Sequence, residues 1–334
     1  MPCIEDFRPQ EAAWRALTAG ELPHAMLITG QPGCGKRTLA GLIAGKLLCE
    51  APSGEKPCGV CRACRQLGDG NHPDLTRIRA GEPISPKVDK GRKTIPVEDI
   101  REMTEIVGRH AYEGDRRVVI IEEADAMTPA AQNALLKTLE EPPAGVTFCL
   151  TCVSPGLLLP TTVSRCREVP LHAWPADALR RVLAGAGMPS GRIEAAVRAC
   201  GGSVGKALAL CGDEAWWNRR TRLMEDFFAL PNRSAIPQIS ARLREERAEA
   251  AEQLDTLDGL IRTLTLASLG RGEAADLDGY PEPWQRAAAS GQYAPFVRLA
   301  DAVALTRRML DSNVGIQALW EKLLLKFMEE RSQW

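Results

Sequence analysis

Short apolar runs and amphipathic stretches alternate along the first half of the chain. The runs at 24–29, 118–121 and 146–151 are almost continuously apolar, as in strands of a parallel sheet covered on both faces. Apolar residues recur at helical spacing over 36–48 and 97–109. This order of strands and helices predicts an α/β domain with a mostly parallel sheet.

Local signals mark the ends of these elements. Thr128 followed by Pro129 predicts an N-cap and a first helical residue, and the helix should end before Pro142. Residues 74–79 alternate like a strand, whereas 80–94 contain several Gly, Pro and Lys and are expected to form an exposed loop. Gly114 is expected to break the helix predicted at 97–109.

The strand signal disappears after about residue 168, and helical patterns follow. Residues 175–212 indicate short helices, and the remainder is helical apart from a Gly- and Pro-rich interruption near 270–284. We therefore expect an α/β domain at 1–168, a small helical domain at 169–212 and a larger helical domain at 213–334.

Composition limits the classes of function. The 334 residues carry a formal net charge of −1, which argues against a strongly basic nucleic-acid-binding domain but leaves room for a local patch. No apolar run approaches the roughly 18 to 20 residues of a membrane span. The N-terminal MPCIEDFRPQ lacks the pattern of a signal peptide. We expect a cytoplasmic protein without a membrane partner.

The segment GQPGCGKRT at 30–38 matches the phosphate-binding pattern G-x-x-x-x-G-K-[S/T] at Gly30, Gly35 and Lys36. In such a loop, backbone N–H groups around residues such as Gly33 cradle phosphate, and the lysine neutralises its charge. We expect this loop to be a site for ATP or ADP. The alternative is a loop that has kept its shape after losing its ligand.

Two departures from that pattern affect the metal ion. Arg37 stands where a hydroxyl would bind Mg²⁺, and Thr38 lies about 100° further round the helix. Glu122 stands where an Asp normally holds the metal, beside Glu123 in the position of the catalytic base. Mg²⁺ binding is therefore in doubt, and we expect ATP hydrolysis to be lost. The alternative interpretation of the two glutamates is a solvated strand end.

Four of the eleven cysteines lie close together, at Cys49, Cys58, Cys61 and Cys64. Thiolates two residues apart can reach one tetrahedral ion, and four of them favour a structural Zn²⁺. An iron–sulfur cluster and free thiols remain alternatives. His72, which precedes Pro73, is interpreted as a turn residue and not as a ligand.

Three features together resemble the bacterial DNA polymerase III clamp-loader family. They are IEEAD at 121–125 followed by NALLKTLEEPP at 133–143, the triplet Ser164-Arg165-Cys166, and the four-cysteine insertion. The resemblance extends to about residue 210. It implies an AAA+ P-loop domain with a zinc module inserted at 49–64, a helical lid domain and a C-terminal helical collar domain for oligomerisation.

The resemblance also implies partners and roles. It places the chain in a five-subunit ring with gamma/tau motor subunits and delta, which loads a sliding clamp onto primer–template DNA. Arg165 would be an arginine finger acting in trans on a neighbour's ATP. Lys206 replaces the arginine of a Gly-Ser-x-Gly-Arg run, and Thr151 lies near the nucleotide-sensing position. The alternative for Arg165 is a structural pair with a carboxylate.

The changes at Arg37, Glu122 and Lys206 indicate a ring component with a degraded ATP site, which is part of the polymerase holoenzyme and not an independent ATPase. One alternative is an active motor ATPase in which Thr38 or Glu122 holds Mg²⁺. Another is a stand-alone nucleotide-binding switch with a zinc module.

The amphipathic stretches at 297–311 and 314–328 suit either an ordinary core or an assembly collar. Periodicity does not decide between these, and the resemblance favours the collar. We expect Trp320 to be buried in a core, whereas Trp334 is a candidate interface anchor.

Overall fold

The computed structural model describes residues 4–18, 20–52, 56–109, 111–112, 114–243, 247–271, 277, 279–310, 312 and 314–332. The chain divides into two compact units. Unit 1 holds residues 1–187 and 200–207, and unit 2 holds 188–199 and 208–334. The division into three domains with boundaries at 168 and 212 stays a prediction.

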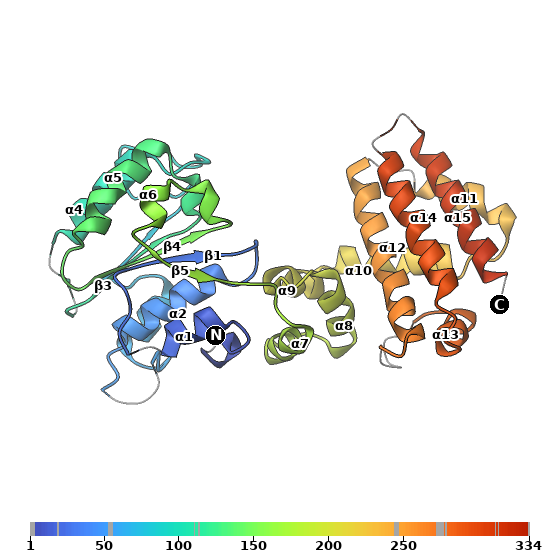
Figure 1. Ribbon diagram of the computed structural model, residues 1–334, viewed down its shortest axis with the longest axis horizontal. Coiled ribbons are helices and arrows are strands. Elements are labelled where there is room, and N and C mark those ends of the chain that lie inside the picture. The colour runs from blue at the N-terminus through green and yellow to red at the C-terminus, as the bar shows by residue number, and fades with distance from the viewer. Residues whose placement is uncertain are drawn as a thin grey trace. The chain divides into compact units, whose positions relative to one another are not determined.

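Unit 1 is built on a five-stranded sheet in the order β2-β3-β4-β1-β5 (Figure 1). Every neighbouring pair of strands is parallel, which confirms the predicted sheet type. The strands are β1 (Ala25–Thr29), β2 (Leu75–Ile78), β3 (Arg117–Ile121), β4 (Val146–Cys152) and β5 (Arg167–Pro170).

Helices cover both faces of this sheet (Figure 1). One face carries α1 (Glu11–Thr18) and α2 (Lys36–Leu48), and the other carries α4 (Val97–Val107), α5 (Pro129–Glu140) and α6 (Pro160–Val163). The other helical segments of unit 1 are α3 (Arg62–Asp69), α7 (Ala176–Gly185) and the short turns Ile4–Phe7, Ala124–Ala126 and Pro155–Leu157. Helix α9 (Val204–Gly212) begins in unit 1 and ends in unit 2.

The apolar runs are continuous because alternate residues of a strand face opposite sides of the sheet, and helices cover both sides. On β3, Val119 and Ile121 belong to the core shared with α4 and α5. Val118 and Ile120 are equally buried and point to the opposite face, which α2 covers (Figure 1). Thr128 caps α5 by accepting a hydrogen bond from the backbone N–H of Ala131, as its position before Pro129 predicts.

Two details of this unit differ from the predictions. Residues 167–170, which were not predicted to be a strand, form β5, which pairs with β1, with Ile28 opposite Val169. This edge strand buries only Val169, so it lacks an apolar run, and an edge position tolerates its proline. The helix predicted to reach residue 109 ends at Val107, where Gly108 is its C-cap, so Gly114 does not end it.

The described part of unit 2 is helical. Its elements are α8 (Ser190–Ala199), α10 (Glu214–Leu223), a π-helical turn (Met224–Phe228), a short turn (Arg233–Ala235), α11 (Ile236–Arg242), α12 (Arg247–Ser268), α13 (Glu282–Ala289), α14 (Ala294–Leu310) and α15 (Ile316–Arg331). No helix in the described ranges combines the length and the apolar character that crossing a bilayer needs.

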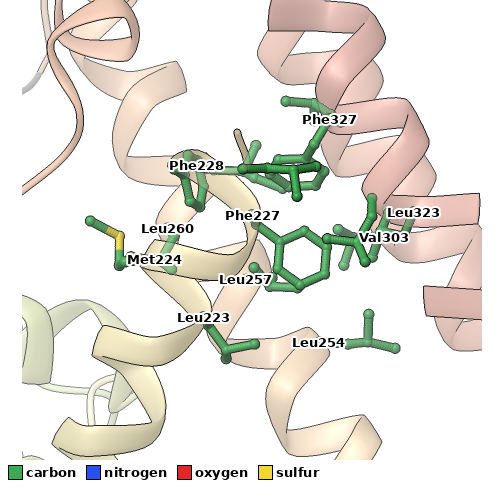
Figure 2. Close-up of a cluster of buried hydrophobic side chains, with 14 of the residues drawn as sticks. Leu223, Met224, Phe227, Phe228, Leu254, Leu257, Leu260, Val303, Leu323 and Phe327 are labelled. Carbon is green, nitrogen blue, oxygen red and sulfur yellow. The ribbon is translucent and has the colours of Figure 1, made fainter. Parts of the chain in front are cut away.

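The core of unit 2 is assembled around aromatic side chains (Figure 2). Phe227 packs edge-to-face against Phe327 and Trp320, with ring centroids 4.9 Å and 6.0 Å apart. Figure 2 shows Phe227 among leucines of α12 and residues of α14 and α15. Trp320 is 1% exposed, which confirms its predicted burial, and Trp334 lies outside the described residues.

A fully buried carboxylate joins α14 to α15. Both oxygens of Glu330 accept hydrogen bonds from Nε of Arg298 at 3.0 Å, and one also accepts from Nη2 at 2.6 Å. Lys326 Nζ lies 2.9 Å from Oε1 of the same carboxylate. The Arg298 hydrogen bonds, followed by those of Lys326, lower the pKa of Glu330 below its ordinary value.

The variant Glu330→Gln is expected to lower the free energy of unfolding by about 2 kcal/mol at neutral pH, since it weakens a charge-assisted network whose cations are partly exposed. A lowered folded-state pKa adds stability above the unfolded-state pKa of about 4.3, and this is lost as the pH falls through the folded-state value. The difference in denaturant unfolding between wild type and variant should therefore shrink as the pH falls below about 4.3 and disappear only below the folded-state pKa. Glu329→Gln, on the exposed neighbour, is the control, and a pH-independent difference would contradict the account.

Candidate functional site

The phosphate-loop pattern lies between β1 and α2, in the strand–loop–helix context that such a loop requires. Gly30, Gly33 and Gly35 all have positive φ, at 144°, 74° and 101°. A Cβ on Gly30 would lie 2.5 Å from the carbonyl oxygen of Leu171, and one on Gly33 would lie 2.3 Å from Oγ of Ser203. The loop conformation therefore depends on glycine at both positions.

The start of α9 packs directly on this loop. The backbone N–H of Gly205 donates to the carbonyl of Gly33 at 2.8 Å, and Oγ of Ser203 donates to the carbonyl of Pro32 at 3.1 Å. The backbone N–H of Lys206 donates to Oγ of Ser203 at 3.2 Å, and the Lys206 side chain is exposed. Lys206 is thus beside the loop, and its contact with nucleotide stays a prediction.

Lys36 folds back over the loop. Its Nζ donates to the carbonyl of Gly30 at 2.6 Å and to the carbonyl of Gln31 at 3.0 Å. The ammonium group therefore lies over the cradle, where the pattern places it for phosphate.

Arg37 and Glu122, the two departures from the metal-binding pattern, contact each other. Nε of Arg37 donates to Oε2 of Glu122 at 2.5 Å, and Nη2 forms an ion pair with the same oxygen. The Glu122 side chain is only 7% exposed, whereas that of Arg37 is 55% exposed. The carboxylate in the metal-holding position thus already has a cation of its own chain beside it. Within the described residues the Thr38 side chain forms no hydrogen bond.

Glu123 follows at the strand end in an unusual backbone conformation. Its φ of 52° is the one positive value among the described residues other than glycine, a conformation that costs energy for a residue with a Cβ. Its backbone N–H donates to Oγ1 of Thr151 at 3.0 Å, and Thr151 is 1% exposed. The structure therefore brings Thr151 next to the acidic pair, and the Glu123 side chain is exposed. The roles of both residues toward nucleotide stay predictions.

Arg165 lies just after α6. Its Nη2 forms an ion pair with Oε1 of Glu140, and its Nη1 donates to the carbonyl of Thr161 at 2.8 Å and to Oγ of Ser164 at 3.4 Å. The side chain is 32% exposed. A carboxylate partner was the alternative predicted for Arg165, and the structure identifies that partner as Glu140, which lies within the NALLKTLEEPP segment.

The four predicted metal ligands come together. The Sγ atoms of Cys49, Cys58, Cys61 and Cys64 all lie within 4.8 Å of one another, and the Cys49–Cys61 and Cys58–Cys64 pairs are each 3.9 Å apart. Four sulfurs about 2.3 Å from one tetrahedral ion would lie about 3.8 Å apart. The cluster therefore fits a tetrahedral metal ion, and His72 is not part of it.

Backbone N–H groups prepare this cluster for a cation. The N–H of Cys61 donates to the sulfur of Cys58 at 3.4 Å, and that of Cys64 donates to the sulfur of Cys61 at 3.3 Å. Hydrogen bonds from the backbone of Val60 and Cys61 lower the pKa of the Cys58 thiol to about 6. Burial raises the pKa of the Cys64 thiol to about 12. A coordinated cation would offset that burial, because a coordinating thiol is deprotonated outright.

We expect the purified chain to hold about one Zn²⁺, the ion that suits four thiolates in a closed site. Elemental analysis by mass spectrometry checks this. Cys61→Ser should reduce the zinc content to near zero, and Cys211→Ser, on a buried cysteine outside the cluster, should leave it unchanged. Stoichiometric iron with acid-labile sulfide would contradict the prediction.

Comparison with known proteins adds an independent finding. The model of the family described as DNA polymerase III, delta subunit, matches residues 10–174. The DNA polymerase III subunit delta' of Escherichia coli (strain K12) is 36% identical over 249 residues, which cover 73% of this chain and 70% of that protein. The delta' subunit of Yersinia pestis is 33% identical over 334 residues, which cover 92% of this chain and 90% of that protein.

The chain is also similar to a second kind of subunit, but over a shorter length. The DNA polymerase III subunit tau of Escherichia coli (strain K12) is 36% identical over 167 residues, which cover 50% of this chain and 24% of that protein. The similarity to delta' therefore extends into the C-terminal helical unit, whereas the similarity to tau covers about half of the chain.

Proposed function

The chain belongs to the DNA polymerase III delta' family, and we propose that it is a clamp-loader component that lends Arg165 to a neighbouring ATP site without hydrolysing ATP itself. In this proposal its neighbours are gamma/tau motor subunits and delta in a five-subunit ring. The complex would load the sliding clamp onto primer–template DNA in the cytoplasm. The similarity to delta' over nearly the whole length of the chain supports membership of such a complex.

The contact between Arg37 and Glu122 carries the proposal that hydrolysis is lost. Two guanidinium nitrogens converge on one oxygen of a nearly buried carboxylate, in the place where that carboxylate would hold the shell of Mg²⁺. Such a charge-assisted pair is strong, and removing either partner leaves the other uncompensated. A guanidinium has no lone pair for a phosphate-bound metal and cannot give up its proton. The two departures are thus a single interaction that competes with the metal.

The packing around the phosphate loop agrees with a mainly structural role. Gly33 accepts a hydrogen bond from the start of α9, and the indole Nε1 of Trp174 donates to the carbonyl of Cys34 at 2.8 Å. These contacts come from residues far along the chain and hold the loop in its conformation. We propose that the loop joins the sheet to the lid helices and that any bound nucleotide is retained and not turned over.

We further propose the division of labour among domains that the family resemblance implies. Residues 1–168 would form the AAA+ domain, 169–212 the lid and 213–334 the collar. The exposed apolar residues on α14, Val297 and Leu305, lie two helical turns apart on one side of that helix and support an assembly role for the last of these. The zinc module would be structural, because all four positions of the metal would be taken by thiolates.

Reconstitution tests this proposal. The motor and delta subunits of the same clamp loader are assembled with and without the chain, and ATP turnover is measured with clamp and primed DNA, alongside the isolated chain. We expect the chain to co-elute with the complex, to be required for full turnover and to show no turnover alone. Robust turnover by the isolated chain, abolished by Lys36→Ala, would identify an active motor instead. Failure to join the complex would favour a stand-alone switch.

A further inference from the structure

Glu140 is the last residue of α5, and its carboxylate forms an ion pair with the Arg165 guanidinium. We infer that Glu140 is a positioning residue that holds the Arg165 guanidinium in the orientation needed to reach a neighbouring ATP site. This inference rests on the proposed function, because Arg165 is the group through which Glu140 acts.

The contacts of Arg165 define its orientation from two sides. Glu140 binds Nη2, and the carbonyl of Thr161 binds Nη1. Thr161 belongs to α6, only four residues from Arg165, so it moves with the arginine. Glu140 is 25 residues away along the chain and belongs to the helix that packs on the sheet. Glu140 is therefore the contact that ties the guanidinium to the rigid part of the domain.

The position of Glu140 on its helix strengthens the case. The C-terminal end of an α-helix carries partial negative charge, so a carboxylate in the last turn is unfavourable unless a cation compensates it. Arg165 supplies that cation. The adjacent Glu141, which is exposed, forms no side-chain hydrogen bond or ion pair with the described residues. The chain thus offers a matched pair of neighbouring glutamates, of which one contacts Arg165.

The guanidinium keeps capacity for a second partner. It is a planar fork with five N–H donors. Glu140, Thr161 and Ser164 engage three of the four N–H groups on the two Nη atoms, and the Nε–H is buried, so one N–H of Nη2 remains for a second partner. The side chain is still 32% exposed. A phosphate presented by a neighbouring subunit can therefore approach an arginine whose direction is already set. Loss of the Glu140 carboxylate would release the long, flexible side chain, and small misplacements of such a group reduce the rate strongly.

The test uses the reconstituted complex with the full-length chain. The Arg165-dependent turnover is defined as the difference between wild type and Arg165→Ala. We expect Glu140→Gln to lower the kcat of the Arg165-dependent turnover about tenfold and to leave the KM for ATP unchanged. Glu141→Gln should match wild type, and Glu140→Asp, which keeps the charge, should retain most of the activity. In an Arg165→Ala background, Glu140→Gln should have no further effect.

The outcomes separate the inference from the proposed function. Wild-type turnover in Glu140→Gln together with reduced turnover in Arg165→Ala would overturn the inference and leave the proposed function intact. Wild-type turnover in Arg165→Ala would overturn the proposed function. A second measurement tests the inference in the isolated chain, by NMR of labelled arginine guanidinium groups. Rotation of the Arg165 group should be hindered in wild type and Glu141→Gln and freed in Glu140→Gln, and equal hindrance in all three would overturn the inference.

Discussion

Replacing Arg165 by alanine is expected to lower ATP hydrolysis at the site that receives it by about 10³-fold, the low end of the range for an arginine finger. Charge accumulates on the phosphoryl oxygens in the transition state, and a guanidinium delivered from the neighbour stabilises it there. The effect should fall on kcat more than on the KM for ATP, because the interaction forms mainly in the transition state.

The measurement for Arg165→Ala is single-turnover ATP hydrolysis by the reconstituted complex with clamp and primed DNA. Arg167→Ala is the matched control, since Arg167 is exposed, lies two residues further along and forms no side-chain ion pair within the described residues. Thermal unfolding of the isolated variant should match wild type within a few degrees, because a partly exposed ion pair contributes only about 0–1 kcal/mol. Wild-type turnover by a complex containing the folded variant would contradict the proposed role.

Replacing Arg37 by threonine is expected to make nucleotide binding by the isolated chain depend on Mg²⁺. The change places a hydroxyl where the loop pattern has its metal ligand, and it frees the Glu122 carboxylate from its guanidinium. We expect the variant to bind ATP about tenfold more tightly with Mg²⁺ than with EDTA, a difference of about 1.4 kcal/mol. Wild type should show no such difference.

Calorimetric titration with ATP, with and without Mg²⁺, measures this effect. Arg37→Ala is the control, because it frees Glu122 but supplies no hydroxyl, so its dependence on Mg²⁺ should be smaller than that of Arg37→Thr. Equal Mg²⁺ dependence in wild type and Arg37→Thr would show that the contact between Arg37 and Glu122 does not compete with the metal.

Features encoded by neighbouring residues could be predicted from the sequence. The helix over 36–48 has the predicted bounds, because the glycine loop fixes its start and its apolar residues face the sheet. The four cysteines also converge as predicted, since two C-x2-C spacings bring three thiols together by local geometry alone. The parallel sheet was predicted from short continuous apolar runs, which are typical of strands buried on both faces.

Features that depend on contacts between distant residues could not be predicted in the same way. Arg37 and Glu122 were each recognised as departures from a pattern, but they are 85 residues apart, and nothing local indicates that they pair. The partner of Arg165 was missed for the same reason. The strand β5 escaped notice because it buries one residue and gains its conformation from pairing with β1.

The most direct test of the central claim is ATP turnover by the reconstituted complex in which this chain alone carries Lys36→Ala. In the structure Lys36 donates hydrogen bonds to carbonyl groups of its own loop. In the proposed function this lysine does not take part in ATP hydrolysis. The account predicts that turnover and clamp loading stay at the wild-type level, in contrast to Arg165→Ala in the same assay. A loss of turnover comparable to that in Arg165→Ala, in a Lys36→Ala chain that is as stable as wild type and joins the complex, would contradict the account.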